Sequence, residues 1–382
     1  MEEWIKCPLG DILNFRRGHD LPKTSMIPGD IPVAGSNGII GFHNVSTPIS
    51  PCITIGRSGN VGTPYIYDKC WAHNTVLYID DYKGNDPKYL YYLLKTLPIA
   101  SFGGGSAVPT LNRNHIHPLE VDFCRDIELQ KKIAGILSKI DDKIEINNQI
   151  NDNLEQQAQA LYRSWFVDFE PFKEGKFIES EIGEIPAGWS IVKFGDIVEI
   201  PKKTINPQKF PDTIFNHYSL PACDNGLIAE VQAGKDIMSN KIILQSNTTL
   251  FSKLNPRIKR IWFTCEVLPN SICSTEFIPY RAKIDTEYSY IFSIVNSDAF
   301  YSSVMGCVNG ATGSHQRFHA EDTEDFLCAY NKDAVNEFSK LIEPILKQMH
   351  DLRQENVKLA LTRDTLLPKL MSGELKINEI DC

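Results

Sequence analysis

Apolar residues recur every three or four positions along two long stretches of the chain. The first, Glu128 to Phe166, contains one Gly and no Pro, and the second runs from Asp333 to Leu366. An apolar seam of period 3.5 requires a partner, so each stretch is predicted to be a long helix that pairs with another helix. The seam comprises Ile133, Leu137, Ile140, Ile144, Asn147, Asn151, Leu154, Ala158, Leu161 and Trp165 in the first stretch, and Phe338, Ile342, Ile345, Met349, Leu352, Asn356, Leu359 and Leu366 in the second.

The chain also repeats itself outside the seams. The seams superpose with an offset of 205 residues, and Trp4–Phe15 (WIKCPLGDILNF) is echoed by Trp189–Ile200 (WSIVKFGDIVEI) with an offset of 185 residues. Each half is therefore predicted to hold a globular part followed by one long helix, with a second globular part that is about 20 residues longer. Two unrelated core helices are the alternative, but they would not explain the second repeat.

Short runs of β-branched residues, separated by turns, fill the globular parts. Tight turns are predicted at Ser36-Asn37-Gly38 and Ser58-Gly59-Asn60, strands at 74–80 and 119–123, and a helix at 86–97. This mixture predicts an α+β fold with two mixed α/β domains, each followed by a long helix. The predicted division is 1–125 for the first domain, 126–167 for the central helix, 168–188 for a connector, 189–330 for the second domain, and 331–382 for the C-terminal helix and tail.

The second domain is predicted to contain strands at 242–250 and 260–268 and a helix at 285–300. Pro344 lies inside the second seam. A proline removes one helical N–H and its ring clashes with the preceding turn. A short lead helix before Pro344 and the long helix after it are therefore expected.

Charge and cysteine usage narrow the class of protein. The net charge is −9, and the ten cysteines are scattered without a C-x-x-C pair. This predicts reduced thiols rather than a disulfide frame or a zinc site. Residues 1–125 carry 11 basic and 11 acidic side chains, so DNA binding would depend on local basic patches or on basic partners. No run of 18 apolar residues occurs and the acidic N-terminus lacks a signal-peptide core, so a cytoplasmic protein without a membrane span is expected.

Six further stretches are informative in their order and repetition: LGDI (9–12), SKIDDKIEINNQIN (138–151), GEIPAGW (183–189), LFSKLNPRI (250–258), CSTEFIPYR (273–281) and LLPKLMSGEL (366–375). Together they resemble the specificity subunit of type I restriction–modification systems over essentially the whole chain. In that family each globular part is a target recognition domain that reads one half of a split DNA site, and the long helices pair as an antiparallel coiled coil.

The resemblance also implies partners. The subunit itself is non-catalytic, binds double-stranded DNA, and docks two modification subunits that carry the methyltransferase activity. Restriction subunits can join the complex. S-adenosylmethionine, ATP and Mg are expected in these partner subunits and no cofactor is expected in this chain. Because the halves differ in length and loop sequence, they are expected to read different half-sites.

Catalytic motifs are missing from the sequence, as the resemblance implies. The chain has neither the N/D-P-P-Y/F loop of adenine methyltransferases nor a phosphate-binding G-x-x-x-x-G-K-S/T loop. Gly103-Gly104-Gly105 is followed by Ser-Ala-Val-Pro, which favours a turn over a methyl-donor loop. His115 and His117 lack the further ligands of a metal site, so none is predicted. An intrinsic methyltransferase is therefore the least favoured hypothesis.

Polar residues beside glycine-rich turns are the candidate DNA contacts. Arg, Asn, Gln, Lys and Ser side chains can bond to base edges, and Lys, Arg and backbone amides can bond to phosphates. For each residue the alternative is a plain turn, or a strand edge, with a solvated polar tip. The candidates are Arg57, Ser58, Asn60, His73, Asn74, Asn112, Arg113 and Asn114 in the first domain, and Lys253, Arg257, Lys259, Arg260, Ser314, His315, Gln316 and Arg317 in the second.

Asparagines interrupt the apolar seams at Asn147, Asn151 and Asn356. Buried Asn pairs cost stability but can fix the register of paired helices, so these residues could set the half-site spacing. The alternative is that they face solvent at the edge of the seam. Helices of 30 to 40 residues would span roughly 45–60 Å, which exceeds one turn of B-DNA.

A different class of function is also compatible with the pattern. A protein-interaction scaffold could use the helix pair as a spacer between heads that bind protein or glycan. Dependence of sequence-specific duplex binding on Arg57, Arg113 or Gln316 would separate the two hypotheses.

Overall fold

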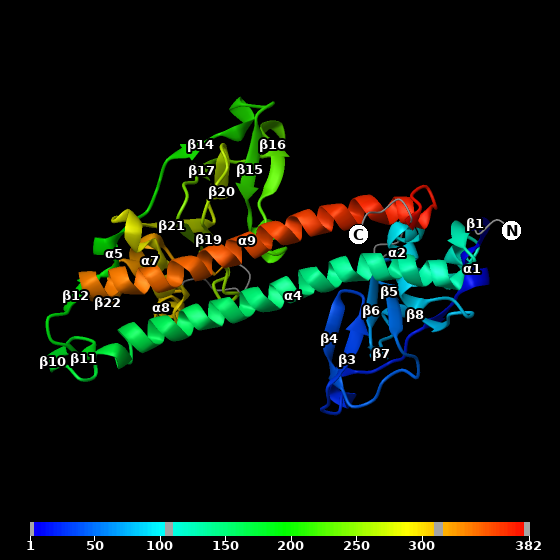
Figure 1. Cartoon of the computed structure of the whole chain (residues 1–382), viewed down its shortest axis with the longest axis horizontal. Coiled ribbons are helices and arrows are strands. Elements are labelled where there is room, and N and C mark those ends of the chain that lie inside the picture. Colours follow the sequence, from blue (N-terminus) through cyan, green and yellow to red (C-terminus); the bar gives the residue numbers. More distant parts are fainter. Residues whose placement is uncertain (1–3, 104–109, 309–315, 378–382) are drawn as a thin grey trace. The chain divides into compact units, whose positions relative to one another are not determined.

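The computed structural model describes residues 4–103, 110–308 and 316–377 (Figure 1). The chain divides into two compact units. The first unit comprises residues 1–144 and 359–382, and the second comprises residues 145–358. Each unit therefore combines one globular part with segments of both long helices.

The two long helices predicted from the seams are present. Helix α4 spans Ile127–Phe166 and helix α9 spans Lys332–Met371, each with 40 residues. Asp126 caps α4 by accepting two backbone N–H bonds of 2.8 and 3.2 Å, and Asn331 caps α9 in the same way with bonds of 3.1 and 3.0 Å. These caps satisfy amide groups that would otherwise lack a partner at the helix starts.

The expected helix break at Pro344 is wrong, because α9 continues through this residue. Ile342 and Leu346, on either side of the proline, are buried in the core of the second unit. A helix-interior proline costs about 3 kcal/mol. Burial of each large apolar side chain contributes roughly 1.5–3 kcal/mol, so packing on both sides outweighs the lost backbone bond.

The globular part of the first unit mixes short strands with short helices. The predicted turn at Ser36-Asn37 joins two of its strands, and the predicted helix at 86–97 is present with Asp86 as its cap. Its elements are β1 (Trp4–Pro8), α1 (Leu9–Ile12), β2 (Asn14–Arg17), η1 (Lys23–Ser25), β3 (Ile31–Gly35), β4 (Gly38–His43), β5 (Cys52–Gly56), β6 (Pro64–Tyr67), β7 (Trp71–Ala72), β8 (Val76–Asp81), α2 (Pro87–Thr96), η2 (Ile99–Phe102), α3 (Arg113–Ile116) and β9 (Glu120–Cys124).

These strands form three sheets. Strands β1 and β9 pair antiparallel, a four-stranded antiparallel sheet has the order β2-β8-β5-β6, and a three-stranded sheet has the order β4-β3-β7 with β3 and β7 parallel. The core of this unit joins Phe15 of the sheet and Tyr89 of α2 to Leu137 of α4 and Leu370 of α9. The helix segments are thus part of the core.

The globular part of the second unit is larger. Its elements are η3 (Glu170–Phe172), β10 (Phe177–Ser180), β11 (Gly183–Pro186), β12 (Ser190–Lys193), α5 (Phe194–Ile197), β13 (Val198–Glu199), β14 (Thr204–Ile205), η4 (Pro207–Lys209), β15 (Ile214–Tyr218), α6 (Leu220–Asp224), β16 (Glu230–Ala233), η5 (Gly234–Asp236), β17 (Lys241–Ile243), β18 (Thr248–Ser252), β19 (Ile261–Thr264), β20 (Ser271–Ser274), β21 (Phe277–Ala282), η6 (Asp285–Glu287), α7 (Tyr288–Asn296), α8 (Asp298–Gly306), η7 (Ala320–Thr323) and β22 (Leu327–Tyr330).

The second globular part repeats the topology of the first. Strands β12 and β22 pair as β1 and β9 do, and the antiparallel sheet β13-β21-β18-β19 corresponds to β2-β8-β5-β6. The parallel pair β15–β20 corresponds to β3–β7, but β14 and β17 extend this sheet to the order β14-β17-β20-β15-β16. The internal repeat predicted from the sequence is therefore confirmed.

Three of the predicted elements differ in detail. The run 242–250 is divided between β17 and β18, which belong to different sheets, because Asn247 adopts a left-handed turn conformation between them. The strand predicted at 260–268 is shorter, since β19 ends at Thr264. The helix predicted at 285–300 is divided into α7 and α8, because Ser297 ends the first and caps the second.

The connector between α4 and the second globular part is ordered. Strands β10 and β11 form a hairpin that follows the C-terminal end of α4 (Figure 1). Phe169, Ile185 and Trp189 are buried in the same core as Phe166 of α4 and Phe338 of α9. The aromatic residues thus attach the hairpin to the helices within the second unit.

Asparagines of the seam lie inside the helix interface of the second unit. Asn147, Asn151 and Asn356 are buried, so the alternative that they face solvent is wrong. Asn147 Nδ2 donates to Asn356 Oδ1 at 2.8 Å, and Asn356 Nδ2 donates to Asn148 Oδ1 at 2.9 Å. Whether they fix the register stays a prediction.

Candidate nucleic-acid interface

Three loops of the first unit that are distant in sequence converge at one place, which we call the first junction. It comprises the β5–β6 loop (57–60), the β7–β8 turn (73–75) and the segment 110–114. The backbone N–H groups of Arg57 and Ser58 donate to Thr75 O at 2.8 and 3.2 Å, and Leu111 N donates to Arg57 O at 2.7 Å. Thr110 also forms a β-bridge with Ser58. The candidates of the first domain therefore lie on loops, or in the first turn of α3, that the structure brings together.

A pocket of about 420 Å³ opens at the first junction. The candidates Arg57, Asn112 and Arg113 contribute to its wall, together with two arginines that were not among the predicted residues. The signal for those two was the adjacent arginine pair directly after the first sequence repeat, Trp4–Phe15. The pocket is lined by Arg16, Arg17, Arg57, Leu77, Thr110, Leu111, Asn112 and Arg113.

The charge of this pocket is strongly positive. Among the described residues, no ion pair joins any of its guanidinium groups to a carboxylate. Burial, with the neighbouring charge of Arg17, lowers the pKa of Arg57. Arg113 Nη1 donates to Phe15 O at 3.1 Å, which anchors its side chain to strand β2. Clustered arginines without acidic partners can bind an anion such as a phosphate.

Other candidates at the first junction support the loops. Asn112 caps α3, Asn60 Oδ1 accepts from Thr63 Oγ1 at 3.2 Å, and Asn74 bonds to Asp20. The remaining candidates there, His73 and Asn114, are bonded as well: His73 Nδ1 lies 3.1 Å from Thr75 Oγ1, and Asn114 N donates to Asn112 Oδ1 at 3.0 Å. Burial lowers the pKa of His73, which favours its neutral form.

The second unit has an equivalent meeting of loops, which we call the second junction. It comprises the start of the β18–β19 loop (253–255), the β20–β21 turn (275–276) and the residues 316–317. Lys253 N donates to Glu276 O at 2.9 Å, as Arg57 N donates to Thr75 O in the first unit. Leu254 forms a β-bridge with Arg317, as Ser58 does with Thr110. The predicted Lys253, Gln316 and Arg317 therefore lie together.

Arg317 and Gln316 differ in their surroundings at this junction. Arg317 Nε and Nη2 donate to Glu276 Oε2 and Oε1 at 3.1 and 3.2 Å. Gln316 Oε1 is buried and has no hydrogen-bond partner among the described residues. Ser314 and His315, also predicted here, lie outside the described residues.

The remaining basic candidates of the second domain follow Lys253 in the β18–β19 loop. Arg260 forms a two-fold ion pair with Asp224, with bonds of 2.6 and 3.0 Å, and Lys259 Nζ donates to Asn296 O at 2.6 Å. Burial lowers the pKa of Lys259. Arg257 is exposed in the turn. Lys259 and Arg260 thus have structural contacts that compete with any contact to DNA.

Metal-ligating side chains do not gather in the described ranges. Within them, no group of three or more His, Cys, Asp or Glu side chains could hold a metal ion. His117 Nε2 accepts from Phe15 N at 3.2 Å, so this histidine supports strand β2. The described cysteines form no disulfide, and the Sγ atoms of Cys52 and Cys70 lie 2.9 Å apart. Over the same residues, no helix is long and apolar enough to cross a membrane.

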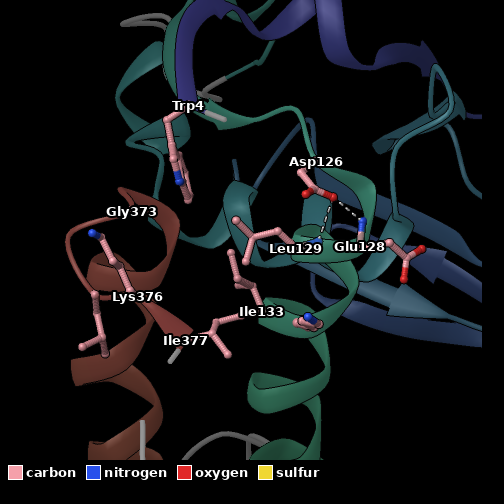
Figure 2. Close-up of a pocket in the computed structure, with 10 residues that line it drawn as sticks. Trp4, Asp126, Glu128, Leu129, Ile133, Gly373, Lys376 and Ile377 are labelled. Atoms are coloured by element: carbon pink, nitrogen blue, oxygen red, sulfur yellow. Dashed lines mark hydrogen bonds between the residues drawn. The ribbon is translucent and has the colours of Figure 1, made fainter. Parts of the chain in front are cut away.

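A second pocket, of about 320 Å³, lies where the start of α4 meets the segment after α9 in the first unit (Figure 2). Trp4 forms one wall, and Gly373 lies against its indole ring. Ile133 of α4 faces Ile377 of the C-terminal segment. This arrangement attaches the C-terminal segment to β1 and α4.

Comparisons with known proteins define the class. The family model of the type I restriction modification DNA specificity domain matches residues 1–156. The HindI specificity subunit of Haemophilus influenzae is 60% identical over 331 residues, which cover 65% of this chain and 68% of that protein. The MjaIX specificity subunit of Methanocaldococcus jannaschii is 25% identical over 311 residues, which cover 77% and 70%.

A solved structure supports the same fold. The crystal structure of the S subunit of a type I restriction–modification system from M. genitalium superposes with a TM-score of 0.61 at 16% identity and covers 96% of each chain. The chain belongs to the family of type I restriction enzyme specificity subunits. It is therefore the non-catalytic DNA recognition subunit of a type I restriction–modification system, and its two junctions are candidates for the recognition surface.

Proposed function

We propose that each globular part reads one half of a split DNA site through its junction. The observation that carries this proposal is the equivalence of the two junctions: the same three loops meet in each repeat, but with different side chains. A repeated scaffold with variable loops suits the recognition of two different half-sites, since loops positioned by a rigid sheet can change without loss of the fold.

The first junction is suited to phosphate contact. Phosphates attract unpaired arginines, and phosphate contacts position a protein on the duplex without reading sequence. Arg16, Arg17, Arg57 and Arg113 supply such positive charge around one pocket. The polar loop residues beside them, including Ser58 and Asn60, would then be placed near base edges. The net charge of −9 implies that basic partner subunits strengthen binding.

We further propose that α4 and α9 pair as an antiparallel coiled coil. Two contacts support this pairing, each inside one unit: Asp141 with Arg363 in the first, and Asn147 with Asn356 in the second. Residue numbers rise along α4 as they fall along α9, which is the order of an antiparallel pair.

The proposed complex contains two modification subunits, and restriction subunits can join it in the cytoplasm. S-adenosylmethionine, ATP and Mg would be held by those partners. The paired helices would offer them a docking surface. The chain itself would contribute DNA recognition alone.

Mapping of methylated adenines tests the proposal. The chain would be co-expressed with a modification subunit encoded beside it, and methylated positions would be read across plasmid DNA. Methylation at one split motif is expected, and exchange of one globular part should alter one half of that motif only. Complex formation without any motif would contradict DNA reading and favour a scaffold whose globular heads bind protein or glycan.

A further inference from the structure

The two junctions carry different side chains at one equivalent topological position. In the first junction, the backbone carbonyl of Thr75 accepts a hydrogen bond from Arg57 N of the β5–β6 loop. In the second junction, the backbone carbonyl of Glu276 accepts the equivalent bond from Lys253 N. The carboxylate of Glu276 holds Arg317 through two bonds, whereas no carboxylate of a described residue pairs with the arginines of the first junction. The two junctions therefore present positive charge in different ways.

The geometry of the Arg317–Glu276 pair leaves part of the guanidinium available. Glu276 binds Nε and Nη2, which form one side of the planar group. A guanidinium has five N–H donors, so the two hydrogens on Nη1 and one on Nη2 have no bond to Glu276. The Arg317 side chain is 44% exposed, and that of Glu276 is 29% exposed. The free end of the group can therefore reach a ligand while its side is fixed.

A guanidinium fixed in this way matches the major-groove edge of guanine. The two Nη groups can donate together to guanine O6 and N7, which is the most common specific contact of arginine with DNA. A carboxylate that holds the side chain reduces the entropy lost when the contact forms. The same carboxylate repels a phosphate, because like charges would come close together. Both effects favour a base over the backbone.

We propose that Glu276 and Arg317 form a specificity-determining pair, in which Glu276 positions Arg317 to read a guanine in the half-site of the second globular part. This inference rests on the proposed function, since it requires the second junction to face the major groove. It assigns a positioning role to Glu276, a base contact to Arg317, and a chemical class, guanine, to one position of the half-site.

Conservative variants of the full chain in complex with its modification subunit test the pair. Arg317→Lys keeps the charge but loses the two-fold donor geometry. Glu276→Gln keeps the size but loses the charge. The measurement is the methylated motif, together with competition binding of duplexes that carry each base at each motif position. A matched control is Arg281→Lys, since Arg281 also pairs with carboxylates, Glu199 and Asp285, in the same unit.

The expected result is loss of discrimination at one guanine of one half-site. Arg317→Lys should reduce the preference for that guanine by about ten- to a hundredfold, and Glu276→Gln should reduce it at the same position by a smaller factor. The other motif positions should keep their preferences. Arg281→Lys should leave the whole motif unchanged, and thermal melting should show that all variants fold.

Two results would overturn the inference without affecting the proposed function. One is a motif that both variants leave unchanged. The other is uniform weakening on all sequences, with a smaller salt dependence after loss of Arg317, which would identify a phosphate contact. A wild-type complex that shows no motif at all would instead refute the proposed function.

Discussion

Arg363 Nη1 of α9 lies 2.7 Å from Asp141 Oδ1 of α4, and the hydroxyl of Tyr92 on α2 donates to Asp141 Oδ2 at 2.7 Å. One carboxylate thus connects both long helices to the globular part of the first unit. Its side chain is 27% exposed, so the ion pair is partly shielded from water. Such a shared, partly buried acceptor contributes more to stability than an exposed ion pair.

Replacement of Asp141 by Asn should therefore destabilise the protein. Asn can keep one bond, to Tyr92 or to Arg363, but Arg363 loses its ion pair with the less exposed of its carboxylate partners and keeps the one with the more exposed Asp364. We expect a loss of about 1–3 kcal/mol in the free energy of unfolding, measured by thermal and denaturant unfolding. The control is Glu128→Gln, because Glu128 pairs with Lys131 in an exposed i,i+3 contact. An equal effect of both substitutions would contradict this role of Asp141.

The packing of Gly373 against Trp4 gives a second prediction (Figure 2). Gly373 has φ +72°, and a Cβ added there would lie 2.6 Å from the indole ring. Gly373→Ala should thus cost about 1–3 kcal/mol through backbone strain and displacement of Trp4.

Gly135→Ala is the matched control, since Gly135 lies in α4 and an added Cβ meets nothing within 4 Å. This substitution should stabilise the protein by roughly 0.5–1 kcal/mol. Melting temperatures that move in opposite directions would support the contact. A neutral Gly373→Ala would show that the C-terminal segment is not held against Trp4.

The seam asparagines give a third prediction. Asn356→Leu alone should destabilise the protein by about 1–3 kcal/mol, because it removes two side-chain hydrogen bonds at the helix interface, from Asn147 Nδ2 to Asn356 Oδ1 and from Asn356 Nδ2 to Asn148 Oδ1, and leaves Asn147 Nδ2 with its bond to Glu355 Oε2. Asn147→Leu with Asn356→Leu should recover or exceed the wild-type melting temperature, since an apolar pair replaces a polar one.

The double variant should also relax the register of the helices. In the complex, methylation at motifs with more than one spacer length would reveal this change, whereas the wild type should use a single spacer. One spacer length in both proteins would contradict the role of these asparagines in register.

The sequence predicted the large elements because their signals are long and repeated. The heptad seams located both long helices, and the echo of Trp4–Phe15 in Trp189–Ile200 located the repeat that the sheets share. The break expected at Pro344 was wrong because apolar residues on both sides of the proline are buried and keep α9 continuous. This burial depends on tertiary packing, which the local sequence does not reveal.

Individual residues of the candidate site could be predicted from the sequence, but their convergence at one junction could not. Arg57, His73 and Arg113 were each selected from loop chemistry, but only the sheet order brings their loops to one junction. Arg16 escaped prediction because it lies on a strand. Arg260 was selected for its charge, which Asp224 neutralises from a distant helix. Long-range pairs of this kind leave no local pattern.

A fourth prediction concerns pH. His217 is buried on β15, where Nδ1 bonds to Gln232 Oε1 at 2.8 Å and Nε2 has no hydrogen-bond partner among the described residues. Burial lowers the pKa of His217. The unfolded chain then binds a proton that the folded chain excludes, so stability should fall as the pH drops below the unfolded pKa of about 6.5. His217→Asn should weaken the dependence of the melting temperature on pH between 7 and 5.5, and an unchanged dependence would show that other groups control it.

The arginine pocket of the first junction gives the last prediction. If Arg57 and Arg113 neutralise phosphates, each replacement by Ala should weaken binding to all duplexes in a similar way. Each replacement should also reduce the magnitude of the slope of log affinity against log salt concentration by about 0.9 for each phosphate contact that is lost. The same pair of effects is expected for Arg16 and Arg17, which line the same pocket. Lys131→Ala is the control, because Lys131 is exposed on α4 and pairs with Glu128. Base-specific changes without a change in slope would instead assign these arginines to base reading, and no effect of any of them would remove the pocket from the DNA interface.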